Sequence, residues 1–380
     1  MKIIYVENVR VPSERAHAYQ IVQTCAWLAR FGHEVTLVNP SRAGDADVFR
    51  AYGLPERLFA HVMLRAWDPL TSAPSFVKAA AYGLQRWAFV RAARQWVRSQ
   101  QADAWYTRDP AMVDALGGTV AGPWALELHD APNNDPARWA RIRDRVQRFV
   151  VISNGLKQKL IELGVPAFRV CVAHDGYDPA LFRTAGDRHA ERTRLGIPDD
   201  AFVAIYTGSF YPWKGTDLVV RAWTRTNPTA HLVMLGGPDA DRKRIAALID
   251  PSALGRVHIL STVERSRTIA MLAIADVGLL TSSPTHAIGR DYTSPLKQFE
   301  YLAAGLPVLA SDVPSSHEVL EARVARYYEP TEAGFASALA SVLNDNAWRE
   351  TVRVAAASVV APYTWEARAR IIERCLLERV

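Results

Sequence analysis

The stretch "SPLKQFEYLAAGLPVLASD", residues 294–312, has the residue types of an anion-binding helix start. Ser294 is a good N-cap, and Pro295 suits the first helical position, where its missing N–H has no intrahelical acceptor anyway. The free N–H groups of Leu296 and Lys297 would then point out of the helix. Together with the helix dipole they favour a bound anion.

Glu300 lies one turn beyond Lys297 in the same stretch. A carboxylate set back from an anion site can accept hydrogen bonds from sugar hydroxyls. The alternative interpretation is an ordinary capped helix at the edge of a sheet, with no ligand.

A second anion candidate is the loop "YTGSFYPWKG", which leaves a strand and reaches the next helix. Gly208 permits a close backbone approach, and Lys214 can offer a point charge to a phosphate. The spacing is not that of a Walker A loop. Both anion candidates lie at the carboxyl ends of strands in the same half of the chain. Open α/β sheets bind ligands at these ends.

Loops in the first half of the chain bring further polar side chains to strand ends. "ELHD" places His129 and Asp130 at the carboxyl end of a strand, although His129 alone could be a structural loop histidine. We expect these loops to face the anion-binding loops of the second half. The candidates in "RVPSERAHAYQ" and "YTRDP" are Arg10, Arg15, His17 and Arg108.

Short β-rich runs alternate with helical stretches along the whole chain, which predicts parallel α/β sheets. "KIIYVEN", an apolar-periodic helix and "HEVTLVNP" form the first βαβ unit. The alternation of strands and helices begins again at "FVAIYTGSF". We therefore predict two doubly wound domains, 1–183 and 184–362, with a cleft between them. The segment 363–380 is predicted to be a terminal helix.

Composition supports a globular protein: 49% of the 380 residues are hydrophobic and 22% are charged. No apolar run is long enough to span a bilayer, and the N-terminus resembles a first strand more than a signal peptide. Cys25, Cys171 and Cys375 form no CxxC pattern, so we expect neither a disulfide framework nor a zinc site, and a cytoplasmic location. Residues 1–183 carry the whole net charge of +6. That excess indicates an anionic partner for this half, or merely a basic surface.

These motifs together resemble the GT-B glycosyltransferases, and most closely the retaining group called family 4. "GHEVTLV", "VVISNGLKQKL", "VAHDGYD" and the loops quoted above fall in the family's order over nearly the whole chain. The resemblance implies two Rossmann-like domains facing across a cleft, with the terminal helix crossing back to the first. It implies transfer of a sugar from a nucleotide-diphosphate donor to a glycan or lipid-linked acceptor, and a role in polysaccharide biosynthesis.

The resemblance also implies roles for individual residues. Lys214 should hold the diphosphate, and Glu300 should bond the ribose hydroxyls. Val263 should lie against the base, and His129 should contact the donor sugar near the reacting carbon. The backbone of the helix start, at Ser294, Pro295 and Leu296, should cap a phosphate.

Two positions depart from the family pattern. Tyr292 stands where the family often has the first of two Glu residues, which puts the identity of the sugar in doubt. Ser209 stands where many members have an Arg that adds a second cation. We hypothesise that Arg290 supplies that charge instead.

The reaction implied by the resemblance needs no metal and no cofactor beyond the nucleotide sugar. No DxD-like motif occurs in a suitable loop, since "DAD" at residues 45–47 reads as a surface turn. Two Arg-rich stretches, "YGLQRWAFVRAARQWVRS" and "ARWARIRDRVQRFVV", could rest on an anionic membrane surface, or could be solvated faces over core stripes. In the second, Arg138, Arg141, Arg145 and Arg148 would share one helical face.

Two other functions stay open at this point. A nucleotide-sugar epimerase can share the architecture, and a non-catalytic subunit of a glycan-assembly complex could bind the donor alone. A nicotinamide oxidoreductase is disfavoured because no G-x-G-x-x-G follows either domain's first strand. Nucleic-acid binding has only the net charge in its favour, so we do not expect it.

Overall fold

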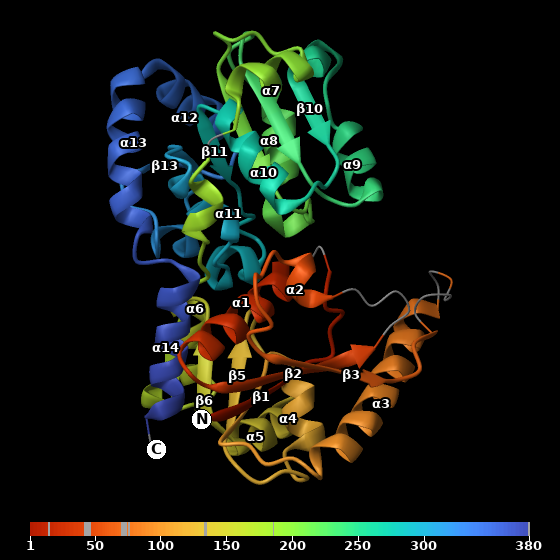
Figure 1. The fold of residues 1–380 in the computed structure, drawn as a ribbon. Helices are drawn as coiled ribbons and strands as arrows, with labels where there is room; N and C mark the ends of the chain where they lie inside the picture. The colour runs from red at the N-terminus through yellow and green to blue at the C-terminus, as the bar shows by residue number, and fades with distance from the viewer. Residues whose placement is uncertain are drawn as a thin grey trace. The chain divides into compact units, whose positions relative to one another are not determined.

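A computed structural model describes residues 1–13, 16–41, 47–69, 74, 77–132, 135–184 and 186–378. The chain divides into two compact units, Met1–His174 with Trp365–Val380, and Asp175–Thr364. Each unit has one parallel sheet, and helices cover both faces of the sheet in the first unit (Figure 1).

The first unit has, in its described part, a sheet of seven parallel strands. In spatial order they are β3 (Ala60–Arg65), β2 (Glu34–Ser41), β1 (Lys2–Val6), β4 (Ala104–Thr107), β5 (Trp124–Leu128), β6 (Val146–Val151) and β7 (Val170–Val172). Its α-helices are α1 (Ala16–Arg30), α2 (Val48–Ala51), α3 (Lys78–Val97), α4 (Pro110–Leu116), α5 (Pro136–Arg145), α6 (Asn154–Glu162) and α14 (Trp365–Leu377).

The second unit has a sheet of six parallel strands in its described part. In spatial order they are β10 (Val257–Leu260), β9 (His231–Leu235), β8 (Val203–Thr207), β11 (Val277–Leu280), β12 (Val308–Ser311) and β13 (Ala325–Tyr328). Its α-helices are α7 (Arg188–Leu195), α8 (Thr216–Ala222), α9 (Asp239–Ala246), α10 (Arg265–Met271), α11 (Leu296–Ala303), α12 (Glu332–Asn344) and α13 (Asn346–Val360).

Both sheets have the doubly wound strand order. Counted from the first strand of each unit, it is 3-2-1-4-5-6-7 in the first sheet and 3-2-1-4-5-6 in the second. Strands such as β8 and β12 are buried at every position, because a parallel sheet is covered on both faces. The order reverses between β1 and β4 and between β8 and β11, and open α/β sheets bind ligands beside such a reversal. The predicted fold class is confirmed.

Helix α14, blue in Figure 1, belongs to the first unit and packs on α1. Its buried stripe is Trp365, Ala369, Ile372 and Cys375, and the Trp365 ring meets the Tyr19 ring edge-on at 5.5 Å between centroids. A large apolar side chain contributes about 1.5–3 kcal/mol when fully buried. This stripe therefore holds α14 to the first unit.

The expectation that the cysteines form no disulfide is wrong. Cys171 of β7 and Cys375 of α14 form a disulfide across a sequence separation of 204. Such a separation leaves no local pattern in the sequence, and only the return of α14 brings the two thiols together. Cys25 is a buried free thiol.

The change of unit comes at Asp175 and not at residue 184. The polar stretch that suggested a linker contains α7, which belongs to the second unit. Arg192 of α7 is fully buried and donates to the carbonyl of Ile274 and to Asp276. The polar composition of this stretch therefore does not mark an exposed linker.

The expected basic face on residues 138–148 does not form. Helix α5 ends at Arg145, and the β-branched and aromatic run that follows it becomes β6. Arg148 is buried in that strand and donates to the carbonyl of Phe168 at 2.7 Å. The other three members of the expected face all reach Asp114: Arg138, Arg141 and Arg145.

Candidate functional site

The loop after β8 begins at Gly208, beside the reversal of strand order in the second unit. Gly208 has φ of +116°, a conformation that favours glycine, and its N–H donates to the carbonyl of Leu235 at 2.8 Å. A Cβ added to Gly236 would lie 2.5 Å from the Gly208 carbonyl, so two glycines allow the ends of β8 and β9 to approach. The Tyr206 hydroxyl donates to the Ser209 carbonyl at 2.7 Å and holds the next peptide.

Lys214 ends the same loop, which is anchored to the residues that follow β11. The Thr281 hydroxyl donates to the Lys214 carbonyl, and the Ser283 N–H donates to the Trp213 carbonyl at 2.9 Å. The Lys214 Nζ lies 3.8 Å from the centroid of the Trp213 indole. Burial lowers the pKa of Lys214 to about 7, and the Asp175 carboxylate opposes that shift.

The start of α11 differs from the predicted capping. Pro295 is the N-cap residue, and among the described residues no side chain caps the helix. The Ser294 hydroxyl instead accepts the N–H of Asp175 at 3.2 Å. The first N–H groups, at Leu296 and Lys297, have no intrahelical acceptor, so this helix start stays suited to an anion.

Lys297 in the first turn of α11 is buried, and its Nζ lies 3.3 Å from the centroid of the Tyr206 ring. The same Nζ lies 3.7 Å from the point that a Cβ on Gly208 would occupy. The sequence predictions gave Lys297 only a backbone N–H at the anion-binding helix start and assigned no role to its side chain.

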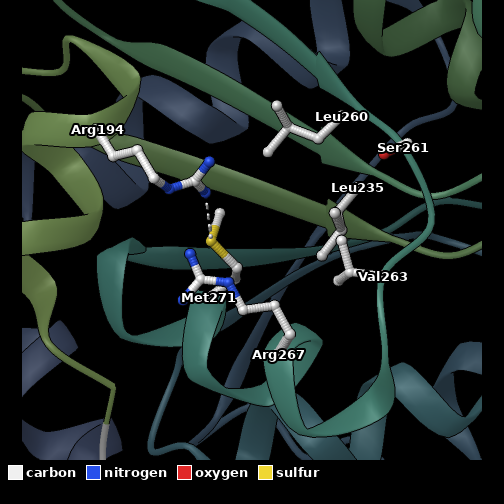
Figure 2. Close-up of a pocket in the computed structure, with 7 residues that line it drawn as sticks. All are labelled: Arg194, Leu235, Leu260, Ser261, Val263, Arg267 and Met271. Atoms are coloured by element: carbon white, nitrogen blue, oxygen red, sulfur yellow. Dashed lines mark hydrogen bonds between the residues drawn. The ribbon is translucent and has the colours of Figure 1, made fainter.

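Glu300, one turn further along α11, is 6% exposed and forms an ion pair with Arg265 at the start of α10. Val263, in the loop after β10, lines a cavity of about 110 Å³. Figure 2 shows Arg194 and Arg267 on one side of this cavity, with Leu235, Leu260 and Val263 on the other. The cavity thus has an apolar wall at the carboxyl ends of β9 and β10, and two guanidinium groups face that wall.

Arg290 and Tyr292 lie in a π-helical turn, Ile288–Tyr292, which follows β11. The exposed Arg290 guanidinium donates to its neighbour Asp291 through Nε and Nη2. Tyr292 is partly exposed at the end of the turn. The structure thus pairs Arg290 with a carboxylate, and it places a different cation, Lys297, beside Gly208.

The first unit holds a buried polar cluster around Glu127 of β5. The Glu127 carboxylate accepts from Tyr106 at 2.6 Å, from Arg368 of α14 at 2.7 Å and from His129 Nε2 at 2.5 Å. Burial alone would raise the pKa of Glu127. Arg368 first, and then His129 and Arg108, outweigh burial and hold this pKa well below its usual value.

His129 is neutral within this cluster. Burial lowers the pKa of its imidazole to about 3, and the charge of Arg108 adds to that shift. Because an ionised Glu127 can only accept, the proton of His129 lies on Nε2 and Nδ1 keeps a lone pair. The imidazole can therefore accept a hydrogen bond, and its orientation depends on a partner that the sequence predictions did not name.

The acceptor-side candidates are only partly brought together. Arg108 donates to the His17 carbonyl at 3.2 Å and to Gln20 at 2.8 Å, and its Nε lies 3.8 Å from Glu127. Arg108 is thus an internal tie between α1 and the strand ends. Arg10 is exposed, and Arg15 lies outside the described residues.

Two further findings concern metals and membranes. Within the described ranges, no three His, Cys, Asp or Glu side chains gather as metal ligands could. Of the "DAD" turn, only Asp47 is described, and its side chain caps α2. Over the same ranges, no helix has the length and apolar character needed to cross a bilayer.

Two family models match this chain and together cover more than half of it. The model for Glycosyltransferase Family 4 matches residues 18–181, and the model for Glycosyl transferases group 1 matches residues 201–345. The chain belongs to the family 4 glycosyltransferases. The predicted family and enzyme class are therefore confirmed.

Two relatives of this glycosyltransferase are both named D-inositol 3-phosphate glycosyltransferase. The D-inositol 3-phosphate glycosyltransferase of Mycobacterium leprae is 27% identical over 319 residues, which are 77% of this chain and 71% of the relative. The protein of the same name from Kineococcus radiotolerans is 33% identical over 150 residues, 38% of this chain and 33% of the relative.

Solved structures share the fold of this glycosyltransferase at low identity. Sucrose-phosphate synthase from Thermosynechococcus elongatus matches with a TM-score of 0.80 at 20% identity, covering 98% of each chain. The Anabaena protein Alr3699/HepE, in a complex with UDP, matches with a TM-score of 0.75 at 18% identity, covering 99% of each chain. At these identities the likeness shows the GT-B fold alone.

Proposed function

We propose that this glycosyltransferase moves a sugar from a nucleotide-diphosphate donor to a glycan or lipid-linked acceptor, with retention of configuration and without a metal. One observation carries the proposal. The Gly208 turn, the Lys214 amine and the uncapped start of α11 gather beside the reversal of strand order in the second unit. Complexes of the Anabaena protein with UDP and with UDP-glucose support the donor class.

The donor is assigned to the second unit, residue by residue. Lys214 and the peptides of Gly208 and Ser209 hold the diphosphate, and the backbone at Ser294, Pro295 and Leu296 caps one of its phosphates. Glu300 bonds the ribose and exchanges its Arg265 partner for the hydroxyl groups. The cavity lined by Val263 receives the base. Tyr292 borders the donor sugar, and a role for Arg290 in binding stays a prediction.

The chemical step breaks the bond between the sugar C1 and the diphosphate oxygen. Negative charge grows on the leaving diphosphate, and a fixed donor aimed at such charge contributes about 3 kcal/mol. Lys214 and the start of α11 fill that role. A diphosphate oxygen takes the acceptor's proton while the new C1–O bond forms on the same face of the sugar.

His129 is proposed to steady the donor sugar near C1. Its Nε2–H is committed to Glu127, so Nδ1 and the ring face are what it offers to a sugar hydroxyl. Neutral His129 is not assigned the role of an acid. Arg10, Arg15, His17 and Arg108 are kept as the acceptor side, with Arg108 acting through Gln20 and Glu127.

A donor panel tests the proposal. UDP-glucose, UDP-N-acetylglucosamine, GDP-mannose and ADP-glucose are screened by thermal shift, and the protein is expected to be stabilised by at least one of them. Lys214→Met should abolish the shift, whereas Lys243→Met, which removes an exposed charge of the same unit, should keep it. Product analysis by NMR in the presence of EDTA should then show a retained glycoside. Release of a free epimerised nucleotide sugar would favour the epimerase.

A membrane surface is proposed as the place where a lipid-linked acceptor is collected. On α3, Tyr82, Leu84 and Trp87 are exposed and stand among the arginines of the same helix. Flotation with liposomes should recover more protein when acidic lipid is present. Trp87→Ser should reduce that recovery, and equal recovery from neutral and acidic liposomes would remove the membrane from the proposal.

We also propose a cytoplasmic location, on the inner face of the membrane when the acceptor is lipid-linked. The disulfide tests this part directly, because reducing compartments keep thiols reduced. Alkylation in intact cells followed by mass spectrometry would compare the state of Cys171 and Cys375 in the cell with the disulfide of the structure, and free thiols there would support the cytoplasmic location. A bridged pair would move the proposal to an oxidising compartment.

A further inference from the structure

Lys297 is a buried lysine whose amine has no hydrogen-bond partner within the described part of the chain. The residue is 6% exposed, and among the described residues no acceptor meets its Nζ. Its closest favourable contact is the face of the Tyr206 ring at 3.3 Å from the centroid. A buried ammonium normally has both a counter-charge and hydrogen bonds, because desolvation is costly. Lys297 is thus held in an arrangement that disfavours its charge.

The groups around Lys297 are those of the proposed diphosphate site. Its Nζ reaches toward Gly208, the residue at which the backbone turns away from β8. Burial and then the charge of Lys214 lower the pKa of Lys297 well below its usual value, and Glu300 opposes them. Lys214 in turn has a pKa of about 7. Two neighbouring amines therefore each resist protonation while no anion is bound.

A dianion bound between the two amines would offset the cost of protonating them. Each phosphate would supply the missing acceptor, and its charge would favour the protonated form of both lysines. The side chain at position 209 is a serine, which offers a hydroxyl and no positive charge to the diphosphate. The Lys297 Nζ, from α11, lies 3.7 Å from the point that a Cβ on the neighbouring Gly208 would occupy.

We infer that Lys297 is a diphosphate-binding residue that acts with Lys214 as a pair of cations, and that it replaces the charge absent at Ser209. The inference rests on the proposed nucleotide-diphosphate donor. It assigns to α11 a side-chain ligand in addition to its backbone N–H groups. Arg290, which already pairs with Asp291, is then not needed as the second cation.

The test is Lys297→Met, which keeps the length of the side chain and removes its charge. Binding of UDP-glucose, or of GDP-mannose or ADP-glucose if one of these binds instead, is measured by calorimetry in two buffers of different ionisation enthalpy. Loss of a charged hydrogen bond predicts an affinity about tenfold to a hundredfold weaker, with fewer protons taken up on binding. Lys243→Met is the control, since Lys243 is exposed and pairs with Asp239.

Thermal unfolding without ligand gives a second readout. Because Lys297 is buried without a hydrogen bond, Lys297→Met should raise the Tm of the free protein by about 2–4 °C or more. A lysine with a purely structural role would show the opposite change. Thus a lower Tm together with unchanged affinity overturns the inference.

The outcomes separate the inference from the proposed function. If the unaltered protein binds none of the three nucleotide sugars, the donor assignment itself fails. If it binds one and Lys297→Met binds it equally well, only the role of Lys297 fails. If Arg290→Ala weakens binding and Lys297→Met does not, the second cation is Arg290 and the inference is wrong.

Discussion

Arg368 of α14 is 3% exposed and donates to Glu127 at 2.7 Å and to the Thr24 hydroxyl at 3.0 Å. Replacement by methionine keeps much of the apolar stem and removes the guanidinium. Glu127 would then remain buried with Tyr106, His129 and a more distant Arg108. The change therefore tests whether this ion pair fastens the terminal helix to the first unit.

The size of the effect follows from burial. Removal of one partner from a buried ion pair typically costs about 3–5 kcal/mol, because the other charge stays desolvated. For a unit of this size, each kcal/mol lowers Tm by about 2–4 °C. We expect Arg368→Met to lower the Tm of the first unit by roughly 6–20 °C.

Arg370 provides a matched control on the same helix. Its side chain is 55% exposed, and its ion pairs with Glu366 and Glu373 are 3.7 and 3.6 Å long. Exposed pairs of this kind contribute about 0–1 kcal/mol, so Arg370→Met should change Tm by only a few degrees.

The assay is thermal unfolding combined with hydrogen exchange read by mass spectrometry, which assigns the loss to a unit. In Arg368→Met, peptides of α14 and β5 should exchange faster, while those of the second unit should stay protected. Equal stability losses in Arg368→Met and Arg370→Met would refute the reasoning, because the buried pair would then contribute no more than an exposed one.

Three further predictions concern titration and backbone geometry. The folded pKa of His129, about 3, lies below its unfolded value of 6.5, so the residue contributes a loss of stability as pH falls from 6.5 toward 3. Urea unfolding at pH 6.5 and 4.5 should show that His129→Gln removes about 2–3 kcal/mol of this loss. Glu7, whose pKa is raised to about 8, makes the folded protein more stable as pH falls, but its contribution is the same in wild type and variant and cancels in the comparison. Affinity for the bound nucleotide sugar should fall as pH rises above 7, by up to about tenfold per pH unit for each of Lys214 and Lys297 that binding must protonate. Lys214→Arg should lower that slope in calorimetry by the share of Lys214, and an unchanged slope would contradict the assignment. Gly208→Ala should weaken donor binding severalfold in the same assay, since φ of +116° is strained for alanine, while Gly255→Ala, with open space at its Cβ, should leave it unaltered.

The fold was predictable because its signals are local. Continuous apolar runs such as those of β8 and β12 mark strands covered on both faces, and the helices between them follow from the apolar period. The loops at Gly208 and at the start of α11 were also predictable as candidates. A glycine, a lysine and a Ser-Pro pair that follow strands can be recognised in the sequence. The parallel topology then places these strand ends at the same edge of the sheet.

Partners that come from distant segments were not predictable. Glu127 and Arg368 are 241 residues apart, and nothing near either one indicates the other. The disulfide between Cys171 and Cys375 was missed for the same reason. The unit boundary was misplaced because a buried arginine, Arg192, cannot be told from an exposed one by composition.

Periodicity and turn residues act over a few positions, so the residues alone predicted two doubly wound sheets, a terminal helix and the strand ends that carry the candidate groups. The return of that helix to the first unit was implied only by the resemblance to the family. Tertiary structure decided which charges are paired. It joined Arg290 to Asp291 and Glu300 to Arg265, and it buried Lys297 beside Gly208, where none of the described residues accepts a hydrogen bond from its Nζ. The physical reason is that the cost of a charge depends on its burial and its neighbours, and these exist only once the chain has folded.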